Sequence, residues 1–556
     1  MLINNKNQGG FVKNNYINMK LLHLVIFAII WVMGFYLAFI PFGITFILSL
    51  IRDFNHKTKK AKEELAKEII KLEEARTTSK WKDFKDTGTE FINSDHEYSS
   101  DLDVFGKASL FQKFNEAKTY FGRRYVKELL TEPNSEILKR QEAVKELLKH
   151  RELMTSLKVE LSLNKEISEN PKELIDLFRT NEKVLKNPII KILAVLLPTV
   201  LIGTIIFSWF EMFIITFFLN IILFLALFIF VSRSISPLYK FKKAMINIKN
   251  IVELITKTEF EAELNKQTKE ILVNEDALKN INKISFLAEA VNVRHNFILY
   301  LILNFGFLWD INIATYLEEL RGKIDIEKWL KQVAHFEAML TLANVSMQEN
   351  TSYPKLTHEN KITSELLAHP LIENPVANSI TLDGIAIVSG SNMSGKTTFL
   401  RTIGINLVLF YAGSAVCATK FEAPRLAILT SMRIADNLEE SISTFYAELI
   451  RIEKIIKKSK TKEPMIFLID EIFRGTNSED RITGAKKVLE QLNKNLGLIT
   501  THDLEVSNNF EGKHGFVNLH FKEEYVDNKI SFDYKMRKGI STTRNAIYLM
   551  KMVGIE

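Results

Sequence analysis

Forty consecutive residues, 192–231, carry a single charged side chain, Glu211, which lies close to the middle of the run. A membrane-spanning helix needs about 20 apolar residues, so this length suits two spans better than one. Basic residues flank both ends of the run: Lys183, Lys186 and Lys191 before it, and Arg233, Lys240, Lys242 and Lys243 after it. Because positive residues mark cytoplasmic flanks, the pattern predicts a transmembrane hairpin over 188–235 with both ends in the cytoplasm. The alternative is a helical hairpin buried inside a soluble core.

A second apolar run, 21–51, has no charged residue over 31 positions and is bounded by a basic residue at each end. It is long enough to cross a bilayer, and it lacks the small-residue cleavage site of a signal peptide. Pro41 and Gly43 interrupt the run, so one long tilted helix and a shallow hairpin of two short helices both stay open. Residues 1–56 are therefore predicted to be an N-terminal anchor in the inner (cytoplasmic) membrane.

Polar, helix-forming sequence surrounds these runs. Residues 57–99 begin rich in Lys, Glu and Ala with apolar residues at helical spacing, which predicts a solvated helical stalk. Residues 100–187 and 236–350 carry amphipathic helical patterns without strand alternation, so we expect one helical domain that the hairpin interrupts. A third apolar run, 297–309, is too short to span a membrane and is interpreted as a core or interfacial helix.

The charge balance and the cysteine content exclude little and favour no partner by themselves. The chain has 73 Lys and Arg against 66 Asp and Glu, a net charge of +7. This balance permits an anionic partner such as nucleic acid or lipid head groups, but it does not argue for one. Cys417 is the single cysteine of the sequence, which excludes an internal disulfide and a zinc site built from cysteines.

The pattern changes near Pro375, where short apolar runs bounded by Gly, Asp and Ser alternate with helical stretches. These runs are GIAIVSG at 384–390, PMIFLIDE at 464–471 and LGLITTH at 496–502. Buried parallel strands joined by helices have this pattern. Residues 351–556 are therefore predicted to form an α/β domain with a mainly parallel sheet, which follows a helical domain that carries transmembrane helices.

The segment GSNMSGKT fits G-x-x-x-x-G-K-[ST] and lies between an expected strand and an expected helix. The glycines let backbone amides close around phosphate oxygens, and the helix N-terminus adds a partial positive charge. Lys396 is expected to reach the β- and γ-phosphates of ATP, and the Thr397 hydroxyl to bind Mg²⁺. The predicted ATP-binding residues of this loop are Gly390, Ser391, Asn392, Met393, Ser394, Gly395, Lys396, Thr397 and Thr398.

The next two apolar runs each end in side chains that can bind a metal ion or transfer a proton. MIFLIDE ends in Asp470, which is predicted to hold Mg²⁺ with Thr397, and Glu471, which is predicted to orient or deprotonate the attacking water. The third run ends in TTHD, and we expect His502 to contact the γ-phosphate. An acidic pair at a strand end is also found as an ordinary solvated terminus. Three such motifs in this order predict an ATPase.

These motifs resemble the ATPase domain of the MutS mismatch-repair family, within the larger group of ABC-type ATPases. The segments that carry the resemblance are GSNMSGKTTFLRTIGIN (390–406), DNLEESISTFYAEL (436–449), LIDEIFRGTNSEDR (468–481), TTHDLEV (500–506) and the closing YKMRKGISTTRNAIYLMKMVGI (534–555). The likeness extends upstream, where 101–130 and 327–343 resemble the family's core and lever helices. About two thirds of the chain is covered.

The resemblance implies a homodimer in which two ATP molecules lie between two ATPase domains. In that arrangement, Ser443 and Thr444 contact the γ-phosphate bound by the partner subunit. From the residues alone, the same pair reads as the N-cap of the following helix, and the two roles are compatible. Asn378 matches an asparagine that lies near the nucleotide in the family, and its alternative is an ordinary turn residue.

The sequence also departs from the family. Members that read mismatches carry a Phe-x-Glu wedge in an N-terminal domain, and here an apolar run and a stalk stand in that place. Phe114, Asn115 and Glu116 fit the three-letter pattern, but they lie inside the core resemblance and are interpreted as an accidental match. Binding of duplex DNA is therefore implied by the family alone.

The sequence is best explained as a membrane-anchored MutS-like ATPase whose ATPase domain faces the cytoplasm. ATP binding closes a dimer and hydrolysis reopens it, which moves the helical arms. Two outputs stay open. In one, the arms clamp DNA, as the family resemblance implies; in the other, the ATPase drives a membrane or protein-remodelling event without DNA. Membrane lipid is the further expected partner.

Overall fold

The computed structural model describes residues 59–132, 136–163, 171–179, 181–391, 393–432, 444–473, 477–526 and 529–541. The chain divides into two compact units, residues 1–71 and 72–556. In the first unit the described residues, 59–71, are helical, and this helix continues to residue 76. The apolar run predicted as an N-terminal anchor lies outside the described residues.

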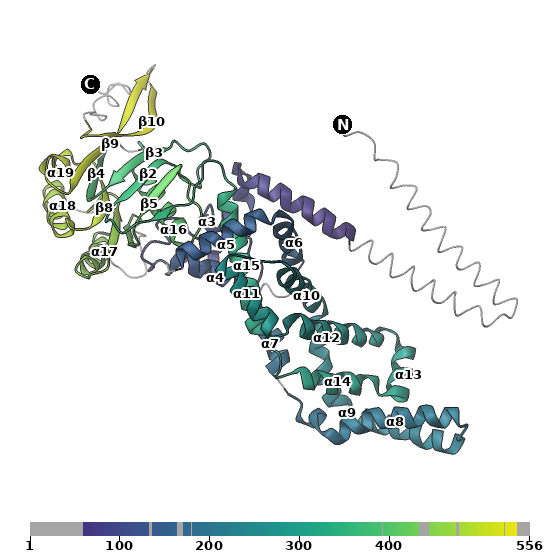
Figure 1. The fold of residues 1–556 in the computed structure, drawn as a ribbon. Coiled ribbons are helices and arrows are strands. Elements are labelled where there is room, and N and C mark those ends of the chain that lie inside the picture. Colours follow the sequence, from purple (N-terminus) through teal and green to yellow (C-terminus); the bar gives the residue numbers. More distant parts are fainter. Residues whose placement is uncertain are drawn as a thin grey trace, which may run out of the picture. The chain divides into compact units, whose positions relative to one another are not determined.

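The regular secondary structure among the described residues between 79 and 346 is helical (Figure 1). In chain order the elements are η2 (Ser79–Asp83), η3 (Thr89–Phe91), α3 (Leu110–Phe114), α4 (Tyr120–Thr131), α5 (Ile137–Lys149), α6 (Arg151–Ser162), α7 (Lys172–Arg179), η5 (Lys183–Lys186), α8 (Pro188–Ile206), α9 (Phe210–Lys240), α10 (Lys242–Lys257), α11 (Glu263–Asn274), α12 (Ala277–Ala290), η6 (Val291–His295), α13 (Phe297–Phe307), α14 (Trp309–Leu320) and α15 (Ile326–Ser346).

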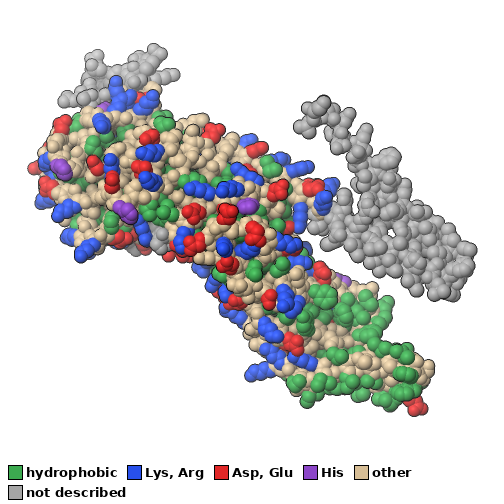
Figure 2. Space-filling view, viewed as in Figure 1, with side chains coloured by type: hydrophobic (Ala, Val, Ile, Leu, Met, Phe, Trp, Pro, Cys, Tyr) green, Lys and Arg blue, Asp and Glu red, His purple; other side chains and the backbone are tan. Residues whose placement is uncertain are grey.

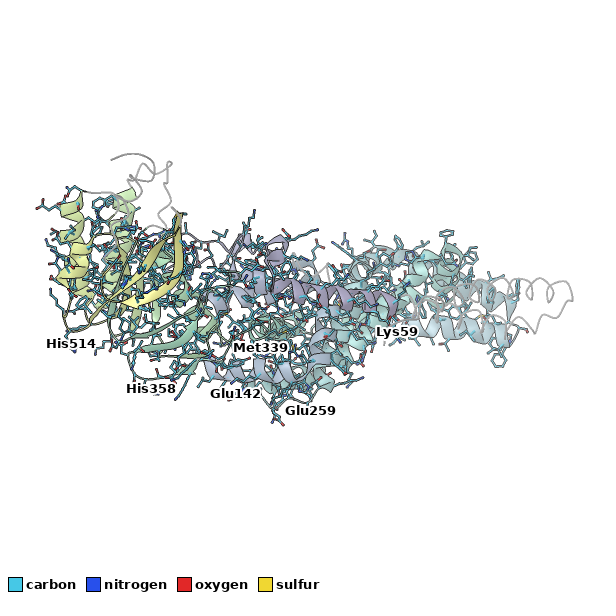
Figure 3. The ribbon with its side chains drawn as sticks, turned by 90° about the horizontal axis from the view of Figure 1, so that it is seen from above. Lys59, Glu142, Glu259, Met339, His358 and His514 are labelled. Atoms are coloured by element: carbon cyan, nitrogen blue, oxygen red, sulfur yellow. The ribbon has the colours of Figure 1, made fainter. Side chains whose placement is uncertain are left out.

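Helix α15 is the centre of this helical part. Sixteen of its 21 residues are buried, since apolar side chains surround most of its circumference, and it packs on α4 and α5. In Figure 3, Met339 of α15 lies in the interior, whereas Glu142 and Glu259 lie at the outer surface. Helix α4 approaches α15 closely at Gly122, where an added Cβ would lie 2.1 Å from a carboxylate oxygen of Glu337.

Glu116 of the Phe-x-Glu triplet belongs to a buried ion-pair network, which supports the interpretation of an accidental match. Glu116 is 6% exposed, and its Oε1 lies 2.6 Å from Arg76 Nη2 and 3.7 Å from Lys158 Nζ. Burial raises the pKa of the Glu116 carboxyl, but the charges of Arg76 and Lys158 outweigh burial and lower it to about 2. A buried and paired carboxylate of this kind stabilises the fold and cannot act as a wedge in DNA.

Replacing Glu116 by glutamine is expected to lower the free energy of unfolding by about 3 kcal/mol at neutral pH, because two buried cations lose their carboxylate. The folded-state pKa lies below the usual value of 4.5. The contribution is therefore present above that value and is lost as the pH falls toward 2. Denaturant unfolding at several pH values measures it. Glu132→Gln, which breaks an exposed pair with Lys127, is the control and is expected to cost less than about 1 kcal/mol.

The 40-residue apolar run forms α8 and α9, which pack side by side as a hairpin. Both helices are long and apolar enough to be candidate membrane spans, with mean hydropathies of 2.5 and 3.0 over their best windows. Glu211 lies in the first turn of α9, directly after the connecting turn. Much of the outer surface of both helices is exposed and apolar, as Figure 2 shows, so the hairpin is not enclosed by the described residues of this chain.

The C-terminal part contains two sheets. Their strands are β1 (Lys355–Leu356), β2 (Ile362–Leu367), β3 (Asn378–Leu382), β4 (Ile385–Ser389), β5 (Lys420–Ala423), β6 (Ala427–Ser431), β7 (Met465–Ile469), β8 (Leu496–Thr501), β9 (Phe516–Val526) and β10 (Lys529–Lys538). The larger sheet has the order β10-β9-β4-β8-β7-β6, and the smaller one β1-β5-β2-β3. Strands β9, β4, β8, β7 and β6 are parallel, but β10 pairs antiparallel with β9, and β2 pairs antiparallel with both neighbours. The sheets are therefore mixed, and the prediction of a mainly parallel sheet is corrected.

Helices cover both faces of the larger sheet (Figure 1). Helix α16 (Lys396–Tyr411) lies on one face, and its apolar residues share a continuous core with the helical part. Helices α17 (Thr444–Ser459), α18 (Ser478–Leu492) and α19 (Leu504–Asn509) cover the other face with a separate core. A three-layer α/β domain results, and it is joined through α16 to the helices before it.

Strand β6 is the last strand of the larger sheet, and a segment from the helical part covers its edge. Thr430 donates its backbone N–H to the carbonyl of Glu97 at 2.9 Å and its hydroxyl to Asp101 at 2.7 Å. The same carboxylate accepts the backbone N–H of Met432 at 3.0 Å and lies 3.4 Å from the guanidinium of Arg451 on α17. These contacts satisfy edge groups that would otherwise be open to another strand.

Candidate functional site

The phosphate-binding motif forms the turn between β4 and α16, as its position in the sequence predicts. Gly390 and Gly395 have φ values of 144° and 104°, and Met393, which is 84% exposed, has a φ of 68°. An added Cβ at Gly390 would lie 3.0 Å from the carbonyl oxygen of Phe521, so both the backbone angle and the space require glycine there. Asn392 lies outside the described residues.

Lys396 occupies the interior of this loop and is 4% exposed. Its ammonium group donates to the carbonyl oxygens of Gly390 and Ser391 at 2.9 and 2.8 Å. It also lies 3.4 Å from Nε2 of His502. The lysine charge is thus held at the position where the motif is expected to contact phosphate oxygens.

Thr397 and Asp470 meet at the ends of α16 and β7. The Thr397 hydroxyl donates to both carboxylate oxygens of Asp470 at 2.9 Å. The Thr500 hydroxyl, at the end of β8, donates to Asp470 Oδ1 at 2.7 Å, and its own oxygen accepts the backbone N–H of Glu471 at 2.9 Å. Thr500 therefore fixes both acidic residues, and sequence reasoning did not single it out, although it stands in the TTHD motif.

Glu471 and His502 face each other across the ends of β7 and β8. Glu471 Oε1 lies 2.5 Å from His502 Nε2, and both side chains are partly exposed. The backbone after β7 takes left-handed φ values of 51° at Glu471 and 63° at Phe473. Such angles cost energy and are held only where the surroundings fix them, which is typical of functional sites. A carboxylate and an imidazole in contact beside the loop can orient and deprotonate a water molecule.

Parallel strand register explains why these residues converge. Ser389 of β4 pairs with Thr501 of β8, and Ile469 of β7 pairs with Ile499. The phosphate loop, Asp470, Glu471 and His502 therefore follow the same edge of the sheet. Ligand sites of α/β sheets lie at this edge.

A cavity of about 520 Å³ opens beside the loop. Gly395, Lys396, Thr397, Thr398 and Glu471 line its polar end. Its other walls are largely apolar and include Leu367, Ile372, Val376, Phe399, Phe521 and Tyr534. Its volume and its mixed polar and apolar lining fit a nucleotide.

Asn378 is the first residue of β3 and lines the same cavity. Its side-chain amide donates to the carbonyl of Tyr534 at 3.0 Å and its oxygen accepts the backbone N–H of Met536 at 2.8 Å. It therefore ties β3 to β10 rather than making a turn, and it supports the Tyr534 wall of the cavity.

His369 is a second cavity residue that sequence reasoning missed. Burial, helped by the charges of Arg401 and Lys113, lowers the pKa of its imidazole to about 4, so the ring is neutral at physiological pH. Its Nδ1 accepts the backbone N–H of Leu371 at 3.2 Å. A neutral ring in a largely apolar wall suits a flat heterocycle better than a phosphate.

The residues expected to act across a dimer are only partly visible. Thr444 is the first residue of α17, while Ser443 lies outside the described residues. Within the described residues no group of three or more His, Cys, Asp or Glu side chains is arranged as a metal-ion site.

Comparison with known proteins gives one family. The family profile for MutS domain V matches residues 386–556, from β4 to the end of the chain. Relatives named DNA mismatch repair protein MutS come from Streptococcus suis, 26% identical over 258 residues, and from Streptococcus mutans and Streptococcus pyogenes, 26% identical over 256 residues each. Each alignment covers 44% of this chain and 29–30% of the relative. The chain thus spans under a third of the length of these relatives.

Proposed function

Since this chain belongs to the MutS family, we propose that it is a membrane-anchored, dimeric ATPase that opens and closes a helical clamp on DNA in a mismatch-repair-related process. One observation carries the ATPase assignment. Lys396, Asp470 and Glu471, which come from distant parts of the sequence, surround a single phosphate loop, with His502 in contact with two of them.

The residues at the sheet edge fit a magnesium ion. Thr397 offers a hydroxyl and Asp470 a carboxylate, and oxygen ligands are those that magnesium prefers. Their oxygens lie 2.9 Å apart. Thr397 and Asp470 would hold the ion, which would supply positive charge beside the phosphate groups when bound.

The remaining residues divide the reaction among them. Lys396 binds the phosphates and holds a positive charge against the oxygens that gain negative charge. Glu471 accepts the proton of the attacking water, and His502, in contact with the Glu471 carboxylate, orients that carboxylate. Thr500 keeps Asp470 and Glu471 in place through its hydroxyl.

We place the second half of the site on the partner subunit of a homodimer. The family resemblance assigns Ser443 and Thr444 to the γ-phosphate of the partner, and α17 begins at Thr444. The first turn of a helix carries free N–H groups and a partial positive charge, which suits this role. ATP binding then closes the dimer and hydrolysis releases it.

Membrane anchoring is proposed from the hairpin α8–α9. Its outer residues are apolar and exposed, for example Ile192 at 62% and Ile222 at 61%. Exposed surface of this size and continuity is unfavourable in water. We place the hairpin in the inner membrane with the ATPase domain in the cytoplasm, because basic residues flank both ends of the run.

The DNA-binding part of the proposal predicts that the full-length chain in detergent binds duplex DNA more tightly with ATP and Mg²⁺ than without nucleotide. Affinity is expected to fall by at least about tenfold between low and physiological salt, since phosphate contacts release counterions. Fluorescence anisotropy of a labelled duplex, with and without ATP, measures this. If the chain does not bind the duplex, or if ATP does not change its affinity for the duplex, the DNA clamp is contradicted.

The insertion of an apolar hairpin into the helical part favours a second candidate function. In this alternative the ATPase remodels a membrane or a membrane protein and does not bind DNA. ATP hydrolysis that responds to reconstitution into vesicles but not to duplex DNA favours the alternative. Stimulation by duplex DNA in detergent favours the clamp.

A further inference from the structure

We propose that α13 is a re-entrant membrane helix, which enters the leaflet next to the helical domain and leaves it on the same side, with its outer face against lipid acyl chains. The proposal rests on membrane anchoring by α8 and α9 and adds a third lipid-contacting element to it. Its partner is the bilayer itself.

The outer face of α13 is apolar and open. Five of its large hydrophobic side chains are exposed: Phe297 (71%), Ile298 (70%), Leu299 (42%), Ile302 (55%) and Phe307 (41%). Residues 297–309 carry no charged side chain. A surface helix of a soluble domain turns polar side chains outward, so this helix has the reverse of the usual pattern on its exposed face.

Helix α13 packs directly on the candidate membrane hairpin. The ring of Phe224 on α9 lies 6.2 Å from the ring of Tyr300 and 5.8 Å from that of Phe305. The side-chain amide of Asn220 donates to the carbonyl of Gly306 at 3.1 Å. Figure 2 shows apolar surface over both α13 and the hairpin, so the outer faces of all three helices lie in one apolar region.

The chain goes out along α12 and returns along α14. The helical segment 277–295 and α13 are bent by 117° at their junction. Arg294, just before α13, pairs with Asp310, just after it, at 2.8 Å, and the Trp309 indole N–H donates to the carbonyl of Ala290 at 3.1 Å. The entry and the exit of α13 are therefore joined. Eleven residues of helix measure about 16 Å, which is half of the hydrocarbon thickness.

Side chains satisfy the backbone at both breaks. Asn296 accepts the backbone N–H of Leu299 at 3.1 Å and so caps the start of α13. Asn304 accepts the backbone N–H of Asp310 at 2.9 Å in the first turn of α14. Broken helices are tolerated at membrane depth when their free backbone groups are bonded inside the protein, and these two side chains each bond one such group.

Lipid fits this face better than a protein does. A protein interface has a polar rim and hydrogen-bonding groups around its apolar centre. Over residues 297–307 the exposed side chains are apolar, and the half-buried Tyr300 is the one that adds a hydroxyl group; this face continues the surface of helices that are long enough to span a bilayer. The experiment must therefore distinguish lipid on this face from a second copy of the chain packed against it.

The test uses single cysteines in a Cys417→Ser background, labelled with an environment-sensitive fluorophore and reconstituted in phospholipid vesicles. Ile302→Cys and Phe297→Cys probe α13, Ile222→Cys probes the hairpin and Glu142→Cys probes an exposed site on α5. Lipids carrying a nitroxide near the head group, or deep in the acyl chain, are the quenchers. The probes on α13 are expected to be quenched at least about twofold more than the probe at residue 142 by one or both nitroxides, since the outer face of α13 lies against lipid acyl chains.

Each result decides between the proposals. Quenching at residue 222 with none at residues 302 and 297, together with access of a water-soluble quencher to both, overturns the re-entrant helix and leaves the anchor standing. Protection of residues 302 and 297 from lipid and water quenchers alike shows a protein-covered face and also overturns it. No lipid quenching at residue 222 contradicts membrane anchoring itself. Two α13 positions are used so that one poorly folding variant does not leave the result open.

Discussion

The Glu471→Gln protein is expected to hydrolyse ATP at least about 100-fold more slowly than the parent while it still binds ATP. Glutamine has the same shape as glutamate, so the hydrogen bond from the backbone N–H of residue 471 to the Thr500 hydroxyl oxygen and the position of the side chain remain. It cannot accept a proton from water, and it replaces the carboxylate that contacts His502. Steady-state phosphate release with Mg²⁺ measures the rate, and titration of a fluorescent ATP analogue measures binding.

Glu479→Gln is the matched control, because this glutamate is exposed in the first turn of α18, a few residues beyond the same strand. It should hydrolyse ATP at the parental rate. If Glu471→Gln also turned over at that rate, the assignment of the water-activating residue would be wrong, although the nucleotide site would stand.

The second large effect is expected for Lys396→Ala, which should weaken ATP binding by about 100-fold, or about 3 kcal/mol. The ammonium group is buried in the loop and holds two loop carbonyls, so its removal takes away both the charge for phosphate and a contact that shapes the loop. The same titration measures the loss. A thermal unfolding midpoint recorded alongside separates weaker binding from a damaged fold.

Lys460→Ala serves as the control for charge alone, since this lysine is exposed after the end of α17. Unchanged affinity is expected there. An affinity in the Lys396→Ala protein within about twofold of the parent would show that the loop does not bind phosphate through this residue.

The catalytic groups could be predicted from the sequence because each follows a buried apolar run. Parallel strands place their C-terminal ends together, so Lys396, Asp470, Glu471 and His502 could be brought to one edge by pattern alone. Thr500 and His369 could not, because their roles depend on hydrogen bonds and burial that no spacing encodes. Tyr534 reaches the cavity only because β10 folds back on β9.

The mixed sheets show the limit of the same reasoning. The runs of β4, β7 and β8 are continuous and apolar, and they predicted parallel strands buried on both faces. Strands β9 and β10 carry many charged residues along an antiparallel pair, with register shifts between Phe532 and Met536, so their sequence has no continuous apolar run. Antiparallel pairs that face water on one side lack the signal on which the prediction relied.

The helical hairpin was predicted with boundaries narrower than those of its helices. The apolar run ends at residue 231, yet α9 continues to Lys240, because its last turns bury Ile235 and Leu238 against neighbouring helices. The composition of an apolar run indicates which residues can contact lipid, but it does not determine where the helix ends. Packing against the rest of the protein decides that.

The segment with Glu97 and Asp101 that covers the edge of β6 limits how the α/β domain can be separated from the rest of the chain. A fragment that begins at residue 351 keeps every residue that lines the cavity beside the phosphate loop. It loses Glu97 and Asp101, and β6 is left with open hydrogen-bonding groups along a free edge. Such a fragment presents a template for strand addition and is prone to self-association. The α/β domain therefore depends on a segment that lies far from it in the sequence. A truncated version must keep the short segment that contains Glu97 and Asp101, before α3, or carry it as a fusion.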